Sequence, residues 1–343
     1  MTAAPPNAFH PDYGHPAALP VAPPADRPTD GGNSLVGVPH GQNAAPKESP
    51  GRGSVPPVSG AAERRPVPHA RRGPGVRGLT DLAGQLSDRD RSVLAVVDDH
   101  RFLTTNQIEQ FYFTQHASKL SAARTARRVL RRLEGWRLLA RPLRRIGGMT
   151  AGSKSSVWML TNMGRRLRNL EAGRGAVGRV REPGERFVQH YLAIADVRLK
   201  LEQASRDRML ELVTVAIEPA AWRSYLGLSG ERLTLKPDLF AVTIAIEGGT
   251  PAEYEDHWFI EVDRGTESIP TLLKQCQQYE AYRRTGTEEQ AHGVFPLVLW
   301  VVPDERRANR LVEAIAETSG LDSGLYWVCT PDGLLAVIRG GTS

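Results

Sequence analysis

Residues 119–145, KLSAARTARRVLRRLEGWRLLARPLRR, hold nine arginines and one lysine against a single acid, Glu134. These ten basic residues and one acid give the segment a net charge of +9, whereas the whole chain of 343 residues carries +6. Positive charge concentrated in one short segment favours binding to a polyanion, because lysine and arginine contacts to phosphate release condensed counterions. We therefore expect this segment to face nucleic acid.

The first part of this segment has the periodicity of an amphipathic helix running from residue 118 to residue 134, with Gly135 as its stop. The apolar face is expected to consist of Leu120, Ala123, Ala126, Val129, Leu130 and Leu133. The opposite face is expected to consist of Arg124, Arg127, Arg128, Arg131 and Arg132. Arginines spaced by four residues repel each other unless a bound anion reduces the repulsion, which favours binding to nucleic acid. The alternative interpretation is a charged surface helix that contacts only solvent.

Two shorter helices precede this one and a hairpin follows it. Ser87 and Thr104 or Thr105 are typical helix starts. Two short apolar runs, 138–145 and Val157–Leu160, flank a glycine-rich connection and predict a β-hairpin, and a closing helix is expected over 161–170. Three helices followed by a two-stranded ribbon are typical of the winged helix-turn-helix, whose third helix lies in the major groove while the wing contacts the DNA backbone.

We accordingly predict a winged-helix DNA-binding domain over residues 79–172, with double-stranded DNA as its partner. The residues expected to contact DNA are Lys119, Arg124, Arg127, Arg128, Arg131 and Arg132 in the third helix, with Arg144 and Arg145 in the wing.

The segment before this domain, residues 1–78, holds 16 of the 25 prolines, and Gly, Ala, Ser and Asn fill much of the rest. Such a composition buries too little apolar surface to offset the entropy of ordering, so we expect a disordered tail. Cys276 and Cys329 make neither a disulfide framework nor a metal set, and their apolar surroundings indicate buried free thiols in a reducing cytoplasm. No stretch has the length of a membrane span, so a membrane is not an expected partner.

The second half of the chain, residues 183–340, alternates apolar strand-like runs with helical patterns. Strands are expected over residues 212–217, 239–246, 258–262, 297–302 and 326–329, and helices over residues 185–204, 269–282 and 308–318. This alternation predicts an α/β domain with a central mixed sheet.

Three carboxylates stand at the ends of two of these strands. Asp238 opens one strand, and Glu261 and Asp263 close the next, with side chains expected on the same face. Such hard oxygen ligands suit Mg²⁺ or Mn²⁺, which can activate water. The alternative is a structural cluster of hydrogen bonds and salt bridges with arginines such as Arg264.

Helices on either side are expected to reach the same place. The helix after Asp263 carries Gln275 and Tyr279 on one side, close to the strand end, where they contact phosphate or pack on the sheet. Glu185 and His190 begin the long helix of this half and can approach the carboxylates.

Together, Asp238, the Glu-x-Asp of residues 261–263 and the Gln-x-x-x-Tyr of residues 275–279 resemble the PD-(D/E)xK nuclease-like superfamily. More narrowly, residues 85–305 resemble the replication-relaxation proteins of plasmids and integrative elements. The segments that carry this resemblance are VWMLTNMG (157–164), residues 190–201, KPD (236–238) and, most specifically, WFIEVDRGTE (258–267).

The resemblance implies a restriction-endonuclease-like fold for residues 183–340 and a DNA-binding role in replication or in relaxation of DNA for transfer, with replication or transfer machinery as a further partner. It implies catalytic positions at Asp238, Glu261, Asp263, Gln275 and Tyr279. The nuclease pattern has lysine where this chain has Asp263. Lys236, Lys274 and Arg264 are near in sequence, but none occupies that position.

Three functions remain open on the sequence. The first is a cytoplasmic DNA-binding protein of plasmid or mobile-element replication or conjugative transfer, with a degenerate nuclease-like domain. The second is a Mg²⁺-dependent endonuclease or relaxase-like nickase. The third is a winged-helix transcriptional regulator.

Overall fold

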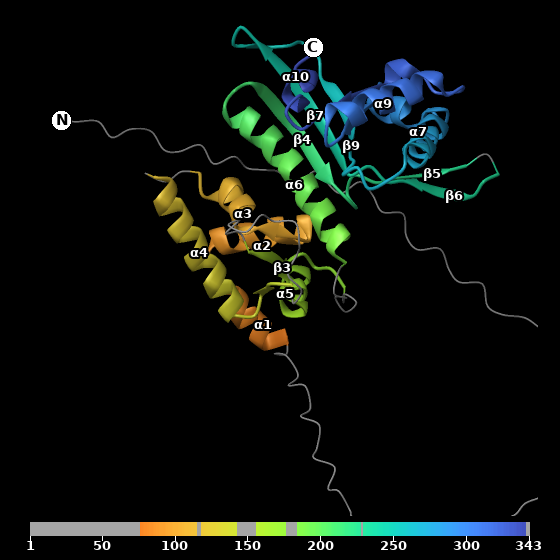
Figure 1. Ribbon diagram of the computed structural model, residues 1–343. Helices are drawn as coiled ribbons and strands as arrows, with labels where there is room; N and C mark the ends of the chain where they lie inside the picture. The colour runs from red at the N-terminus through yellow and green to blue at the C-terminus, as the bar shows by residue number, and fades with distance from the viewer. Residues whose placement is uncertain (1–75, 115–117, 143–155, 176–183, 228, 341–343) are drawn as a thin grey trace, which may run out of the picture. The chain divides into compact units, whose positions relative to one another are not determined.

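The computed structural model describes residues 76–114, 118–142, 156–175, 184–227 and 229–340, and all of them belong to one compact unit (Figure 1). The tail predicted over residues 1–78 lies outside the described residues up to residue 75. Its last three residues begin the first helix, so the described order starts earlier than expected.

Four helices open the described chain: α1 (Val76–Ala83), α2 (Asp88–His100), α3 (Thr105–Tyr112) and α4 (Lys119–Gly135). Ser87 caps α2 and Thr104 caps α3 through capping boxes, in which the third helical residue bonds back to the cap. Ser118 caps α4, which confirms the predicted amphipathic helix. The sequence does not predict α1, because this short helix contains Gly78 and adjoins the proline-rich tail.

A small antiparallel sheet packs with these helices. Its strands are β1 (Leu103–Thr104), β2 (Leu139–Ala140) and β3 (Val157–Leu160), in the order β1-β3-β2. The pairing of Leu139 with Leu160 confirms the paired part of the predicted hairpin. Its connection, residues 143–155, lies outside the described residues. The strand β1 is not predicted, because two residues are too few for an alternating pattern.

The helix α5 (Asn162–Glu171) closes this part of the chain as predicted. Gly164 lies so close to Leu138, the residue before β2, that a Cβ atom at Gly164 would be 2.3 Å from the Leu138 carbonyl oxygen. Only glycine allows this approach without a shift of the backbone. The close approach brings α5 against the start of β2, where Thr161 N–H donates to the same carbonyl at 3.0 Å.

The second half of the chain is built on a six-stranded mixed sheet with the order β11-β10-β9-β7-β4 and β8 paired to β7. Its strands are β4 (Leu210–Ile217), β7 (Leu239–Glu247), β8 (Thr250–Pro251), β9 (Asp256–Val262), β10 (Leu297–Val301) and β11 (Tyr326–Cys329). β4, β7 and β9 are antiparallel neighbours, whereas β9, β10 and β11 run parallel. The predicted α/β architecture with a central mixed sheet is therefore confirmed.

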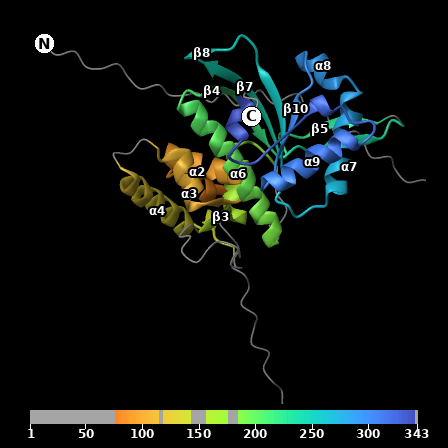
Figure 2. The ribbon, with the colours of Figure 1, turned by 45° about the horizontal axis from the view of Figure 1, so that its top comes forward.

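Helices cover both faces of this sheet: α6 (Glu185–Arg206) and α10 (Leu334–Ile338) on one, α7 (Ile269–Arg283) and α9 (Glu305–Glu317) on the other (Figure 2). Phe259 and Ile260 of β9 show the alternation: Phe259 joins the core under α7 and α9, and Ile260 joins the core under α6. The structure adds α8 (Thr287–His292), a short 3₁₀ helix (Ser323–Leu325) and a two-stranded hairpin, β5 (Arg223–Leu226) and β6 (Arg232–Leu235), none of them predicted.

The helix α6 contributes to two hydrophobic cores. Ala195 and Leu199 pack with the residues of α2, α3 and α4. Ile194 and Leu201 pack with the residues of the large sheet. Both cysteines are buried free thiols, as expected. Within the described ranges, no helix combines the length and the apolar character needed to span a membrane.

Candidate functional site

The helix α4 has a buried face and a charged face. Ala126, Leu130 and Leu133 are fully buried in the core with α2 and α3. Leu120, expected on the same face, is instead 71 % exposed, because the core contacts of α4 begin one half-turn later, at Ala122.

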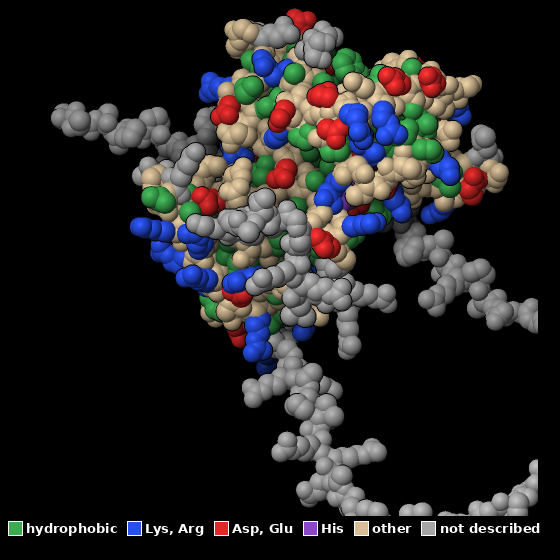
Figure 3. Space-filling model, viewed as in Figure 1, with side chains coloured by type: hydrophobic (Ala, Val, Ile, Leu, Met, Phe, Trp, Pro, Cys, Tyr) green, Lys and Arg blue, Asp and Glu red, His purple; other side chains and the backbone are tan. Residues whose placement is uncertain are grey.

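The opposite side of α4 presents four exposed arginines, Arg124, Arg127, Arg128 and Arg131, which we call the arginine face. Within the described residues, none of these four guanidinium groups forms an ion pair, whereas other arginines of this half do. Figure 3 shows Lys and Arg side chains gathered along α4. A one-signed face of this kind repels itself, and the repulsion falls when an anion binds.

Three other residues predicted to contact DNA are not placed by the structure. The side chain of Lys119 is not described, and Arg144 and Arg145 lie in the connection outside the described residues. Arg132 is described and has a partner inside the fold: its Nη2 lies 2.5 and 2.7 Å from the two carboxylate oxygens of Asp90 in α2.

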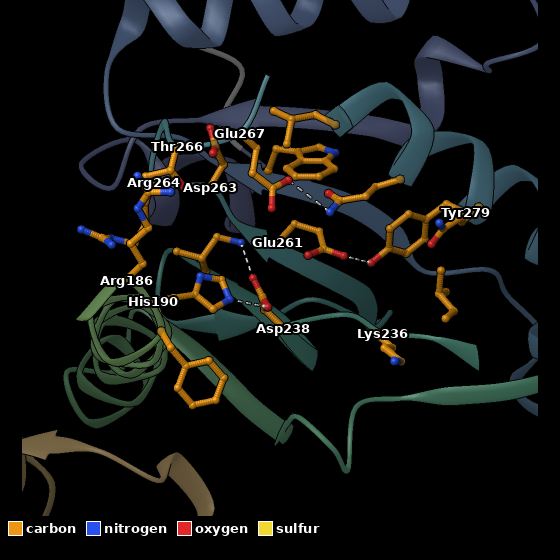
Figure 4. A pocket seen from close by; sticks show the side chains of 17 residues that line it. Arg186, His190, Lys236, Asp238, Glu261, Asp263, Arg264, Thr266, Glu267 and Tyr279 are labelled. Atoms are coloured by element: carbon orange, nitrogen blue, oxygen red, sulfur yellow. Dashed lines mark hydrogen bonds and ion pairs between the residues drawn. The ribbon is translucent and has the colours of Figure 1, made fainter. Parts of the chain in front are cut away.

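The predicted carboxylates of the second half meet at a pocket of about 610 Å³, which we call the Asp238 pocket (Figure 4). It lies where β7 begins and β9 ends, between the first turns of α6 and the side of α7. Its polar lining includes Arg186, His190, Lys236, Asp238, Glu261, Asp263, Arg264, Glu267, Gln275 and Tyr279. The strand order brings Asp238 and Glu261 together, because β7 and β9 are antiparallel neighbours.

Asp238 is buried and both of its oxygens are bonded. Oδ1 lies 3.0 Å from Nε2 of His190, and Oδ2 accepts the Val262 N–H at 2.8 Å. Burial opposes the charge of the His190 ring, but the hydrogen bond with Asp238 and the nearby Glu218 carboxylate outweigh burial and raise the pKa of His190 above its usual range. The hydrogen bond between His190 and Asp238 ties α6 to the edge of β7.

Glu261 faces Asp238 from the next strand and is bonded to α7. The Tyr279 hydroxyl donates to Glu261 Oε1 at 2.5 Å. Burial and the neighbouring Asp238 carboxylate raise the pKa of Glu261 well above its usual range. Burial and the adjoining Glu261 also raise the pKa of Tyr279 well above its usual range, so the hydroxyl keeps its proton. This hydrogen bond connects α7 to the end of β9.

Asp263 is turned away from this pair. It follows the last residue of β9, its Oδ1 accepts the Gly265 N–H at 2.9 Å, and its Oδ2 is bonded to Arg307 Nε of α9. The expected arrangement of three carboxylates around one point is therefore not found, because Asp263 is paired with Arg307 of α9.

Gln275 lines the pocket but does not contact Asp238 or Glu261. Its Nε2 donates to Glu267 Oε2 at 3.4 Å, and its buried Oε1 has no hydrogen-bond partner among the described residues. Of the two lysines near in sequence, Lys236 lines the pocket with its amine 4.9 Å from the centre of the Trp222 ring, and Lys274 is not part of the lining.

The carboxylates of Asp238, Glu261 and Asp263, in the arrangement described above, do not fit a bound divalent cation. In the described part of the chain, no three His, Cys, Asp or Glu side chains are arranged to hold a metal ion. Both oxygens of Asp238 are bonded within the fold, and Asp263 is paired with Arg307. Binding of Mg²⁺ or Mn²⁺ at Asp238, Glu261 and Asp263 stays a prediction that this arrangement does not support.

Sequence reasoning missed Arg186 and Glu267, which line this pocket, and Arg307, which pairs with Asp263. Arg307 sits in the first turn of an amphipathic helix 44 residues after Asp263, and no sequence signal pairs the two. Arg186 had a signal, since it precedes His190 by one helical turn and therefore shares its face.

Comparison with known protein families matches the chain to the replication-relaxation family, whose model covers residues 94–298, more than half of the chain. The matched span begins in α2 and ends in β10, so it includes the arginine face and the polar residues named above that line the Asp238 pocket. Comparison with curated proteins gives no match.

Proposed function

The chain belongs to the replication-relaxation family, whose membership implies a role in replication, and from this premise we propose that it binds duplex DNA through the arginine face of α4. The site of binding is an origin of a plasmid or mobile element. The partner machinery is that of replication or conjugative transfer.

The arrangement of α2 to α4 and the small sheet supports this proposal. The element order α2-β1-α3-α4-β2-β3, with the strands paired as β1-β3-β2, has the layout of a winged helix-turn-helix, in which the third helix enters the major groove. In this layout α4 is the third helix. The contact of Arg144 and Arg145 with the DNA backbone stays a prediction, because both residues lie outside the described residues.

The single observation that carries the proposal is the contrast within α4. Arg124, Arg127, Arg128 and Arg131 are exposed and form no ion pair with a described residue, on a helix whose other face is packed into the core from Ala122 onward. The four guanidinium groups need not break an internal ion pair to contact a phosphate group. Bound phosphate groups also reduce the repulsion between the guanidinium groups.

For residues 183–340 we propose a nuclease-like fold that supports DNA binding or assembly without cutting. The residue at position 263 favours this role: the nuclease pattern has a lysine there that helps to position the attacking water, whereas this chain has Asp263, which is paired with Arg307. The position of Lys236 also favours the non-cutting role. Its amine lies over the Trp222 ring rather than at the position of the nuclease lysine.

The binding proposal is tested with the full chain and a fluorescent duplex of about 30 base pairs, measured by anisotropy over a series of salt concentrations. We expect binding that weakens steeply as salt rises, since counterion release drives it. A chain that stays unbound at low ionic strength contradicts the proposal.

The rival function, a Mg²⁺-dependent nickase, draws support from the convergence of His190, Asp238 and Glu261 in one pocket. It is tested by incubating supercoiled plasmid carrying the cognate origin with the chain and either Mg²⁺ or Mn²⁺. Open-circle product that forms with the natural chain and disappears with Asp238→Ala would overturn the non-cutting role. We expect the plasmid to stay supercoiled with both proteins.

A further inference from the structure

Arg132 differs from its neighbours on α4 by having an acidic partner within the fold. Its Nη2 contacts both oxygens of Asp90, at 2.5 and 2.7 Å, and its guanidinium carbon lies 5.5 Å from the centre of the Trp136 ring. Arg132 is therefore held from two sides.

Asp90 is the buried centre of this contact. It is only 1 % exposed and also accepts hydrogen bonds from the Ser87 N–H at 3.0 Å and the Ser87 hydroxyl at 2.7 Å. Asp90 thus completes the cap of α2 and holds the last turns of α4 at the same time. One carboxylate joins the start of one helix to the end of the other.

The charges of Asp90 and Arg132 oppose the exchange of this internal contact for a contact between Arg132 and a phosphate group. If Arg132 turned outward to a phosphate group, it would leave a buried carboxylate without its cation, and such a carboxylate is strongly unfavourable. The four residues of the arginine face have no partner of this kind among the described residues, so they can contact phosphate without breaking an internal pair.

We propose that Asp90 and Arg132 are positioning residues for the DNA-binding helix. Their contact fixes the orientation of α4 on α2, and the arginine face contacts the DNA. This inference rests on the proposed function, and it removes Arg132 from the residues expected to touch DNA.

The salt dependence of binding separates the two roles. A phosphate contact contributes to the slope of log K against log salt by about 0.9. A positioning residue changes only the fraction of chains whose helix is competent to bind, which lowers the affinity without changing the slope. We therefore expect Arg132→Lys to weaken binding roughly tenfold at unchanged slope, because lysine keeps the charge but has a different donor geometry.

The matched variants are Arg128→Lys and Arg128→Ala, on the exposed face one turn away. We expect Arg128→Lys to bind nearly as the natural chain does, and the slope for Arg128→Ala to be shallower by about 0.9. If Arg132→Lys behaves as Arg128→Lys does, or if Arg132→Ala flattens the slope as Arg128→Ala does, the positioning role is wrong.

Asp90→Asn gives a test of opposite sign. If Arg132 were a phosphate contact held back by Asp90, this change would free it, tighten binding and steepen the slope. The positioning role predicts weaker binding at unchanged slope. Ser87→Ala is the control for the cap, since it removes the Ser87 hydroxyl from Asp90 and leaves the Arg132 pair in place, and we expect a smaller loss of affinity than with Asp90→Asn.

The outcomes distinguish the two claims. A natural chain that does not bind duplex DNA contradicts the proposed function and this inference together. A natural chain that binds, and whose Asp90→Asn variant binds more tightly, contradicts the positioning role alone. Circular dichroism and thermal unfolding of each variant verify that the compared proteins are folded.

Discussion

The side-chain amide of Gln107 in α3 donates hydrogen bonds to Asp196 Oδ1 at 2.7 Å and to the Leu192 carbonyl at 2.9 Å, both in α6. Gln107 is only 3 % exposed, and its Oε1 accepts the Thr104 N–H at 2.9 Å. One buried side chain therefore completes the cap of α3 and connects it to the helix that covers the large sheet. These bonds lie beside the apolar contacts of Ala195 and Leu199.

Replacing Gln107 by alanine should destabilise the fold by about 1–3 kcal/mol, because it leaves buried polar groups without partners. Urea unfolding gives the free energy. Gln110→Ala is the control, since this side chain is exposed on the same helix, and its effect should stay within about 0.5 kcal/mol. Equal effects of the two changes would show that the bonds to α6 contribute nothing.

Gly164→Ala should destabilise the fold by about 1–3 kcal/mol or more, because the new Cβ would lie 2.3 Å from the Leu138 carbonyl oxygen and force the backbone apart. The matched change is Gly135→Ala at the end of α4, where nothing lies within 4 Å of the Cβ position. That change should be neutral or stabilise the fold by about 0.4–1 kcal/mol. Thermal unfolding of both variants provides the comparison, and a tolerated Gly164→Ala would mean that α5 does not approach β2 so closely.

Arg307→Ala should destabilise the fold by about 3 kcal/mol, since it leaves the buried carboxylate of Asp263 without its cation. The Arg307 guanidinium also donates to the Glu267 carbonyl at 2.7 Å, so the loop after β9 should loosen as well. Arg306→Ala removes the same charge from the exposed neighbouring position and should change the free energy of unfolding by no more than about 0.5 kcal/mol. Chemical denaturation measures both, and a harmless Arg307→Ala would argue that Asp263 has another partner.

His100 should make the fold sensitive to mild acid. Burial lowers the pKa of its ring well below the usual range, and the nearby Arg198 adds to the effect. The ring therefore stays neutral in the fold, whereas in the unfolded chain it binds a proton below about pH 6.5. The free energy of unfolding is therefore highest above that pH. It falls by about 1.4 kcal/mol for each pH unit below it, until the ring in the folded chain is protonated too.

The measurement is the free energy of unfolding of the natural chain and of His100→Leu at pH 7 and pH 5. The difference in free energy of unfolding between the two proteins should shift by about 2 kcal/mol in favour of the variant from pH 7 to pH 5. His292→Leu, at a largely exposed position, serves as the control. A difference in free energy of unfolding that does not change with pH would mean that the His100 ring is in contact with water in the folded chain.

The sequence predicts most of the regular elements because their signals are local. The helix α4 is found from its apolar spacing and from Ser118 and Gly135 at its ends, and the five long strands are found as apolar runs. Local patterns do not reveal β1, which has two residues, or the hairpin β5–β6, whose strands bury few side chains. β1 forms where β3 supplies its partner strand, and the hairpin packs on the core under α7 through Tyr225 and Leu235.

The Asp238 pocket is predictable in part for the same reason. Neighbouring strands bring Asp238 and Glu261 together, and the Gln-x-x-x-Tyr spacing places Tyr279 beside them. Glu261 contacts α7 and Asp263 contacts α9, so both side chains lie on the face that the strand alternation predicts. The pairing of Asp263 with Arg307 has no local signal, because Arg307 lies 44 residues further along the chain.

The arginine face is the central claim, and the salt dependence of DNA binding tests it most directly. The comparison uses the natural chain, the triple change Arg124/Arg128/Arg131→Ala, and the charge-matched control Lys274/Arg306/Arg310→Ala on exposed positions of α7 and α9. We predict that the triple change flattens the slope of log K against log salt by about 2.7, or about 0.9 for each phosphate group that is no longer neutralised, and that the control keeps the natural slope. An unchanged slope in the triple variant, or an equal flattening in the control, would contradict DNA binding by α4.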